Sequence, residues 1–222
     1  MRLAWKIAPG VGPAAAALAA IAIAAWLCFI RMNAPAAMSG MAMPASLGGS
    51  FAMWEVMAVA MMTPTLARPV FASGNRGIVF TLVFMGGYLS VWSVFALLAA
   101  VVERELDGSG RWIAFAFLAA AGLYQWTRLK TASLEACRRR AVLNGEGSAA
   151  IFRGGLRYGL CCLGCCWLLM ALMIATGMGN FWVALGLTLA MLGERFLPQA
   201  RYVTGAACMV LAAGVSAQLA PF

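Results

Sequence analysis

Long apolar runs separated by short polar stretches set the hydrophobic pattern of this chain. Seven runs can be drawn, over residues 12–30, 51–66, 77–102, 112–127, 158–176, 181–192 and 202–219. A helix that crosses the roughly 30 Å hydrocarbon core of a bilayer needs about 20 consecutive apolar residues. The pattern therefore predicts an all-α fold, a polytopic transmembrane bundle of about seven helices.

Three of these runs leave alternatives open. Runs 51–66 and 181–192 are short for a full span, so a tilted, an extended and a re-entrant helix all fit them. Pro64 lies at the inner end of the first of these, where a proline bends or ends a helix. The run 12–30 also resembles a cleavable signal peptide, but its apolar core is long for one, so we favour an uncleaved helix.

Composition and charge give the bundle an orientation. The chain is 64% hydrophobic and 10% charged, which favours a single integral membrane domain over residues 1–222. With the amino terminus inside, 13 of the 16 lysines and arginines face the inner side, and Arg31, Arg104 and Arg111 remain outside. The positive-inside rule thus predicts an N-in, C-out, multi-pass membrane protein, with the lipid bilayer as its main partner. If one short run is re-entrant, the carboxyl terminus moves inside.

Two loops stand out. The predicted outer loop, residues 31–50, is rich in methionine, with Met32, Met38, Met41 and Met43. The predicted inner loop, residues 128–157, is basic and polar, and we expect a short surface helix around residues 133–143.

Cysteines cluster at the start of the fifth run. The chain has seven Cys, 15 Met and no His, so sulfur is its only soft metal donor. The cluster consists of Cys161, Cys162, Cys165 and Cys166. On a helix, residues four apart are neighbours, so we expect Cys161 beside Cys165 and Cys162 beside Cys166. Thiolates at this spacing favour Cu(I), whereas small apolar packing is the alternative role for each cysteine.

A second set of candidate metal ligands lies in the run 51–66. Met57 and Met61 are four residues apart on one helical face, while Glu55 and Met62 share another. An ionisable side chain within a span commonly marks a site, although a residue at the membrane interface is the alternative for Glu55. Core packing is the alternative for the methionines.

Several short motifs together resemble a bacterial family of predicted metal-binding integral membrane proteins, a domain of unknown function, over residues 51–214. They are Trp54, Met57, Ala60-Met61-Met62 and Pro64; Gly87-Tyr88, Trp92 and Phe95; Ala121-Gly122-Leu123-Tyr124-Gln125 and Leu129-Lys130; Cys162-Leu163-Gly164-Cys165-Cys166-Trp167; and Glu194. The resemblance implies metal binding and a location in a bacterial inner (cytoplasmic) membrane. Ser133 stands where the family carries the first cysteine of an inner-loop pair that ends in Cys137-Arg138, so the intramembrane cysteines are the better metal candidates here.

Three functions compete. The first is handling of Cu(I), by delivery, sensing or passage, with the metal held by Met and Cys side chains. The second is a non-catalytic accessory or assembly subunit of a larger membrane complex, or a homo-oligomer, in which Gly86-Gly87 and Gly154-Gly155 serve helix packing. The third is a thiol redox enzyme, for which the nearest basic residue in sequence is Arg157, four positions before Cys161.

Other functions lack sequence support. The chain has no phosphate-binding glycine loop, no nucleophile–base pair and no nucleic-acid module. We therefore favour a non-enzymatic role and expect no nucleic-acid partner.

Overall fold

The computed structural model describes residues 11–33, 46–72, 76–106, 110–139, 147–177, 179–197 and 199–217, and the regular structure within them is helical. The elements are α1 (Val11–Met32), α3 (Leu47–Met62), the 3-10 helix η1 (Thr63–Leu66), α4 (Ala67–Ala72), α5 (Gly77–Glu105), α6 (Gly110–Gln125), α7 (Arg128–Arg139), α8 (Ser148–Thr176), α9 (Phe181–Phe196) and α10 (Ala200–Ala217). Each of the seven predicted apolar runs overlaps one helix or one continuous helical stretch. The prediction of an all-α bundle is confirmed.

Four helical stretches are long and apolar enough to cross a membrane. They are Gly12–Met32, Leu47–Ala72, Gly77–Glu105 and Ser148–Thr176, while α6 and α10 are shorter apolar helices. The second stretch reaches this length because η1 and α4 continue α3 beyond Pro64, which stands in the first turn of η1. The predicted run 51–66 is thus the central part of a longer helical stretch, as expected if neighbouring residues extend it.

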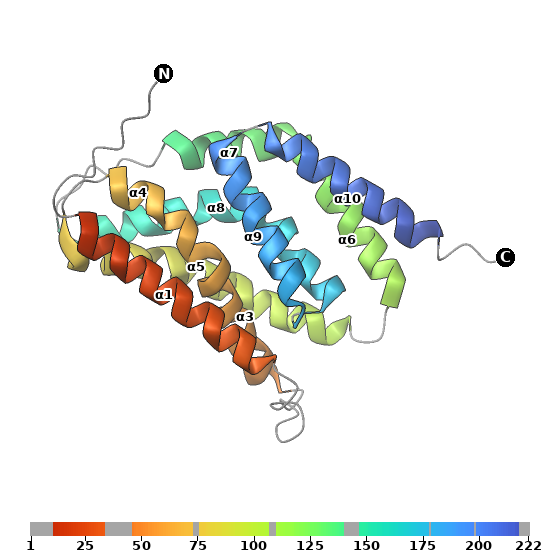
Figure 1. Cartoon of the computed structure of the whole chain (residues 1–222), viewed down its shortest axis with the longest axis horizontal. Helices are drawn as coiled ribbons and strands as arrows, with labels where there is room; N and C mark the ends of the chain where they lie inside the picture. Colours follow the sequence, from red (N-terminus) through yellow and green to blue (C-terminus); the bar gives the residue numbers. More distant parts are fainter. Residues whose placement is uncertain are drawn as a thin grey trace.

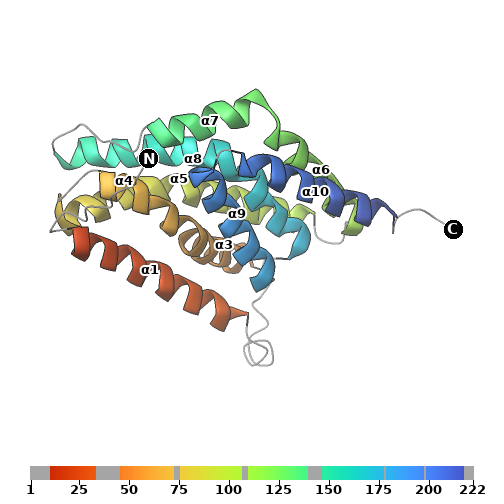
Figure 2. The ribbon, with the colours of Figure 1, turned by 45° about the horizontal axis from the view of Figure 1, so that its top comes forward.

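The helices lie side by side across the bundle, as Figure 1 and the turned view in Figure 2 show. The principal contacts join α1 to α3, α3 to α5, α5 to α8, α8 to α6 and α6 to α10. Helix α7 packs on α8, and α9 contacts α8, α10 and α3. Helix α8, which carries the cysteine cluster, is therefore surrounded by other helices of the same chain.

Glycines allow α5 and α8 to touch backbone to backbone. A Cβ atom on Gly87 would lie 2.2 Å from the carbonyl oxygen of Phe152, and one on Gly155 would lie 2.2 Å from that of Phe84. Small residues at such crossings let membrane helices approach closely. The assembly-subunit hypothesis assigned Gly87 and Gly155 to packing against other proteins. In the structure, both glycines pack α5 and α8 of the same chain against each other. The contact also brings Tyr88 of α5 against α8.

The predicted loops need two corrections. Helix α8 begins at Ser148, ten residues before the predicted start of its run, and α7 occupies residues 128–139 as a packed helix with a buried face. Helix α9 continues to Phe196, four residues past the predicted end, because it carries two charged residues that find partners inside the bundle. Residues 34–45 of the methionine-rich loop, including Met38, Met41 and Met43, lie outside the described residues.

The α5–α8 contact gives a packing test. We expect Gly155→Leu to destabilise the protein by about 1–3 kcal/mol or more, because the added side chain forces apart two backbones in contact. Thermal unfolding of purified protein in detergent measures this. The matched control is Gly186→Leu in α9, where a Cβ meets no other atom within 4 Å. Equal melting temperatures for the two variants would contradict the proposed role of the contact.

Candidate metal centre

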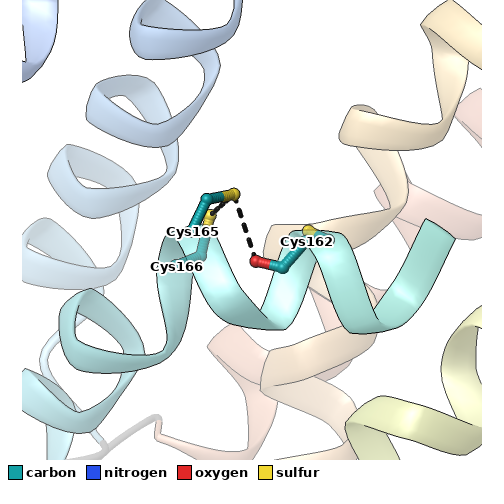
Figure 3. Close-up of side chains that lie close together, drawn as sticks. All are labelled: Cys162, Cys165 and Cys166. Carbon is teal, nitrogen blue, oxygen red and sulfur yellow. Dashed lines mark hydrogen bonds between the residues drawn. The ribbon is translucent and has the colours of Figure 1, made fainter. Parts of the chain in front are cut away.

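Three cysteine thiols converge on one face of α8, as Figure 3 shows. Cys162, Cys165 and Cys166 are all buried, and their sulfur atoms lie within 4.8 Å of one another. The Cys165 thiol lies 3.2 Å from the Cys166 sulfur and donates a hydrogen bond to the carbonyl oxygen of Cys162 at 3.1 Å. They converge because residues at i, i+3 and i+4 share a helical face. We call these three residues the cysteine trio.

A buried arginine from α9 contacts the trio. The Nη2 atom of Arg195 lies 2.7 Å from the Sγ atom of Cys162, and its Nη1 atom donates to the Tyr158 hydroxyl at 2.5 Å. The hydroxyl of Tyr88 lies 3.0 Å from the same sulfur. A cation and a hydroxyl beside a buried thiol favour its thiolate form, which is the form that binds metal.

Pro69 accounts for one further hydrogen-bond acceptor of Arg195, the carbonyl oxygen of Thr65. The carbonyl oxygen of Thr65 in η1 accepts hydrogen bonds from the Tyr158 hydroxyl at 3.3 Å and from Arg195 Nη1 at 3.5 Å. In a continuous α-helix this carbonyl would accept from residue 69, but Pro69 has no backbone N–H. The freed carbonyl therefore faces the bundle interior, where it joins η1 to α8 and α9.

A buried ion pair lies next to the trio. The Nζ atom of Lys130 in α7 is 2.6 Å from a carboxylate oxygen of Glu194 in α9, and both side chains are almost fully buried. Lys130 also donates to the carbonyl oxygen of Cys165. Burial lowers the pKa of Lys130, but the charges of Cys166 and Glu194 outweigh this, so its pKa is raised and the side chain stays charged.

The inner-loop cysteine belongs to the same neighbourhood. Cys137 of α7 is buried on the face of that helix that packs on α8. The neighbouring thiol of Cys161 and the burial of the side chain raise the pKa of Cys137. Cys161 is half-buried, and neither it nor Cys137 belongs to the trio.

The candidate ligands of α3 are only partly joined to this centre. Met57, Met61 and Met62 are buried in the same core, and the last two lie within one helical turn of Thr65. Glu55 is ten residues before Thr65, about 15 Å along the helix at 1.5 Å per residue. One of its carboxylate oxygens is buried without a hydrogen-bond partner among the described residues. Metal binding by these four residues stays a prediction.

Basic residues near the trio correct two sequence-based inferences. Lys130 and Arg195 were assigned to loops as topology signals, yet both are buried, because α7 packs on α8 and α9 extends inward. The lack of a basic residue near the cysteines, which counted against thiol redox chemistry, does not hold, because Arg195 arrives from another helix.

Two features of the sequence point to Lys130, Glu194 and Arg195. Lys130 and Glu194 both belong to the motifs of the family resemblance, and Glu194-Arg195 follows an apolar run after a single glycine. The pairing itself leaves no trace in sequence spacing, since Lys130 and Glu194 are 64 residues apart.

These features define the class of protein: an all-helical chain with membrane-length helices and a buried group of three thiols suited to a soft metal ion. The chain belongs to the family described as PpoB2, copper chaperone, whose model matches residues 51–217. No curated protein and no solved structure matches the chain. The match confirms the metal-binding family that the sequence motifs indicated, and supports copper as the metal.

The buried ion pair gives a stability test. Glu194→Gln removes one partner and leaves the Lys130 ammonium buried without its counter-charge, so we expect a loss of about 3–5 kcal/mol in unfolding free energy. The double variant Lys130→Met/Glu194→Gln should recover much of that loss. Denaturant unfolding in detergent measures both.

The control for this test is the exposed pair of Arg139 and Glu135, 3.3 Å apart on α7. Glu135→Gln should leave stability unchanged, since exposed pairs contribute little. A double variant that is less stable than Glu194→Gln alone would argue against a coupled pair.

Proposed function

We propose that this protein is a membrane-bound copper chaperone that holds one Cu(I) ion at Cys162, Cys165 and Cys166 and delivers it to another protein. The observation that carries this proposal is the convergence of three buried thiols within 4.8 Å, in a chain that belongs to a copper chaperone family. Thiolates are soft ligands that suit Cu(I), and the three sulfurs fit two- or three-coordinate binding. The ion is cargo, so its site must both bind and release it.

The charges around the trio support a cation bound by thiolates. A metal–thiolate group in an apolar interior needs compensating charge, because isolated buried charges are costly. Arg195 compensates a thiolate at Cys162, and the hydroxyl of Tyr88, 3.0 Å from the same sulfur, can donate a hydrogen bond to that thiolate. Lys130 holds the carbonyl oxygen of Cys165 and is itself compensated by Glu194. These residues orient the ligands and do not bind the ion.

The methionines of α3 suggest a route by which Cu(I) reaches the trio from the outer side of the membrane. Met57, Met61 and Met62 form a buried series of thioethers along α3 that ends one turn from Thr65, which contacts Tyr158 and Arg195. Such a series could bring Cu(I) from the outer side to the trio, with Glu55 near its outer end. The distribution of basic residues supports an orientation in which α8 begins at the inner face of a bacterial cytoplasmic membrane, with the trio about halfway along that helix.

The family description favours delivery of copper over redox catalysis by the thiols. The contact between Arg195 and Cys162 serves a reactive thiol as well as a metal ligand, so geometry alone supports both roles. The family description names copper, and three convergent thiols exceed the two that a dithiol exchange needs.

The deciding experiment is a Cu(I) titration. Wild-type protein purified in detergent under anaerobic, reducing conditions should bind about one Cu(I) per chain, competed against a chromogenic Cu(I) chelator. The triple variant Cys162→Ser/Cys165→Ser/Cys166→Ser should lose this binding, because hydroxyls are poor ligands for a soft cation.

The control for the titration is Cys28→Ser/Cys208→Ser, which removes two thiols on α1 and α10. It should bind as the wild type does. Unchanged stoichiometry in the triple variant would rule out the trio as the site, and copper-free wild-type protein with a disulfide in the trio would favour redox chemistry.

Arg195 offers a second test of the site. Arg195→Gln removes the charge that compensates Cys162, so we expect Cu(I) affinity to fall by about 10–100-fold while the stoichiometry stays near one. Arg195→Lys keeps the charge, so its Cu(I) affinity should lie between those of the wild type and Arg195→Gln. Competition titrations measure the affinities, and unfolding curves of the same samples separate a folding defect. An affinity equal to wild type in folded Arg195→Gln would argue against charge compensation.

A further inference from the structure

A pocket lies between α7 and the turn that joins α9 to α10. It has a volume of about 260 Å³, and its lining includes Thr131, Glu135 and Arg138 of α7 and Arg201 and Tyr202 of α10. Figure 1 shows the start of α10 beside α7. No cysteine lines this pocket, so it is separate from the metal centre.

Arg201 is held in a fixed orientation at this pocket. Its Nη1 atom donates to the Thr131 hydroxyl, and its Nη2 atom donates to the Tyr202 hydroxyl at 2.6 Å. Its Cζ atom also lies 4.6 Å from the centroid of the Tyr202 ring. These contacts use only part of the donor capacity of a guanidinium group, so the other N–H groups can bind a ligand. A fork of donors that is already oriented suits the oxygens of a phosphate group.

The charge of the pocket is positive. Arg138 and Arg201 contribute cations, and Glu135 contributes a carboxylate. That carboxylate is 3.3 Å from Arg139, which compensates its charge. No acidic side chain among the described residues forms an ion pair with Arg138 or Arg201. The pocket therefore favours an anion that offers several oxygens to two guanidinium groups.

The apolar side chains around the pocket favour an amphipathic ligand. Leu197 and Val203 flank the pocket-lining segment in sequence and are 62% and 72% exposed. Trp126 lies against Gly205, one helical turn after Tyr202, and tryptophan and tyrosine are enriched where a bilayer meets water. A free phosphate ion would leave these side chains uncovered, whereas acyl chains cover them.

The predicted orientation points to the same ligand. The basic residues of α7 and of the α9–α10 turn put this end of the bundle on the predicted inner side of the membrane. The inner leaflet carries anionic lipids, and basic pockets between membrane helices bind their headgroups.

We propose that this pocket binds the phosphate headgroup of an anionic phospholipid, whose acyl chains lie along the apolar surface of α10. Arg138 and Arg201 contact the phosphate oxygens, and the hydroxyls of Thr131 and Tyr202 keep Arg201 in place. The bound lipid joins α7 to α10 at the membrane surface. Copper takes no part in this site, so its test does not depend on the proposed function.

Native mass spectrometry of the full-length protein in a neutral detergent tests the site. The protein is equilibrated with increasing dioleoyl phosphatidylglycerol, and the fraction of chains that retain one lipid gives the affinity. Dioleoyl phosphatidylcholine has the same acyl chains and no net charge, so we expect it to bind about tenfold more weakly. Arg138→Gln should weaken binding of phosphatidylglycerol about fivefold, and Arg138→Gln/Arg201→Gln about tenfold or more.

Matched variants separate the pocket from general attraction to charge. Arg157→Gln removes an exposed basic side chain of α8 that does not line the pocket, and it should bind phosphatidylglycerol as the wild type does. Arg201→Lys keeps the charge and should lose less affinity than Arg201→Gln. Melting temperatures without lipid identify a variant that does not fold. If Arg201→Gln is such a variant, Arg138→Gln alone carries the test, because Arg138 has no ion-pair partner to lose among the described residues.

Several outcomes would overturn the lipid site. Equal retention of the two lipids would show that the headgroup charge is not recognised. An equal loss of affinity in Arg157→Gln and Arg138→Gln would reduce the effect to net charge. Displacement of phosphatidylglycerol by an equal concentration of inorganic phosphate would make the pocket a site for a free anion. Wild-type protein that retains no phosphatidylglycerol would rule the site out.

Discussion

A guanidinium group inside an apolar bundle is stable only where its N–H groups find acceptors and its charge is compensated. Arg195 finds a sulfur on Cys162, a hydroxyl on Tyr158 and a carbonyl on Thr65. These acceptors come from α8 and η1, so the arginine fixes the end of α9 against both. Tyr88, which touches Cys162 and Thr65, adds α5 to the same junction. The position of the cysteine trio depends on this one buried charge.

The two adjacent charged residues of α9 face different helices. Successive helical residues are turned by about 100°, so Glu194 and Arg195 point to different neighbours. Glu194 pairs with Lys130 of α7, and Arg195 contacts α8. The end of α9 thereby couples the helix that carries Cys137 to the helix that carries the trio. Prolines contribute as well, because Pro69 leaves the Thr65 carbonyl free for the junction.

The cysteine trio is enclosed by several helices. Its sulfurs share one face of α8, which contacts α5, α6, α7 and α9. Helix α7 covers the cysteine segment, since Lys130 donates to the carbonyl oxygen of Cys165 and Ser133 lies against Gly164. A soft ion held at the trio, as proposed, would therefore lie inside the bundle.

Sequence alone determined the membrane class, the all-α fold and the cysteine segment, because apolar run length and i, i+3, i+4 spacing are local properties of a helix. It also indicated the metal-binding family through its motifs. It placed Lys130 and Arg195 in loops and Cys161 beside the trio, since spacing says nothing of which helix a side chain faces. Only the tertiary structure decided that Arg195 and Lys130 meet the cysteine segment. Partners on separate helices are chosen by packing and by the need to compensate buried charge, which no local pattern records.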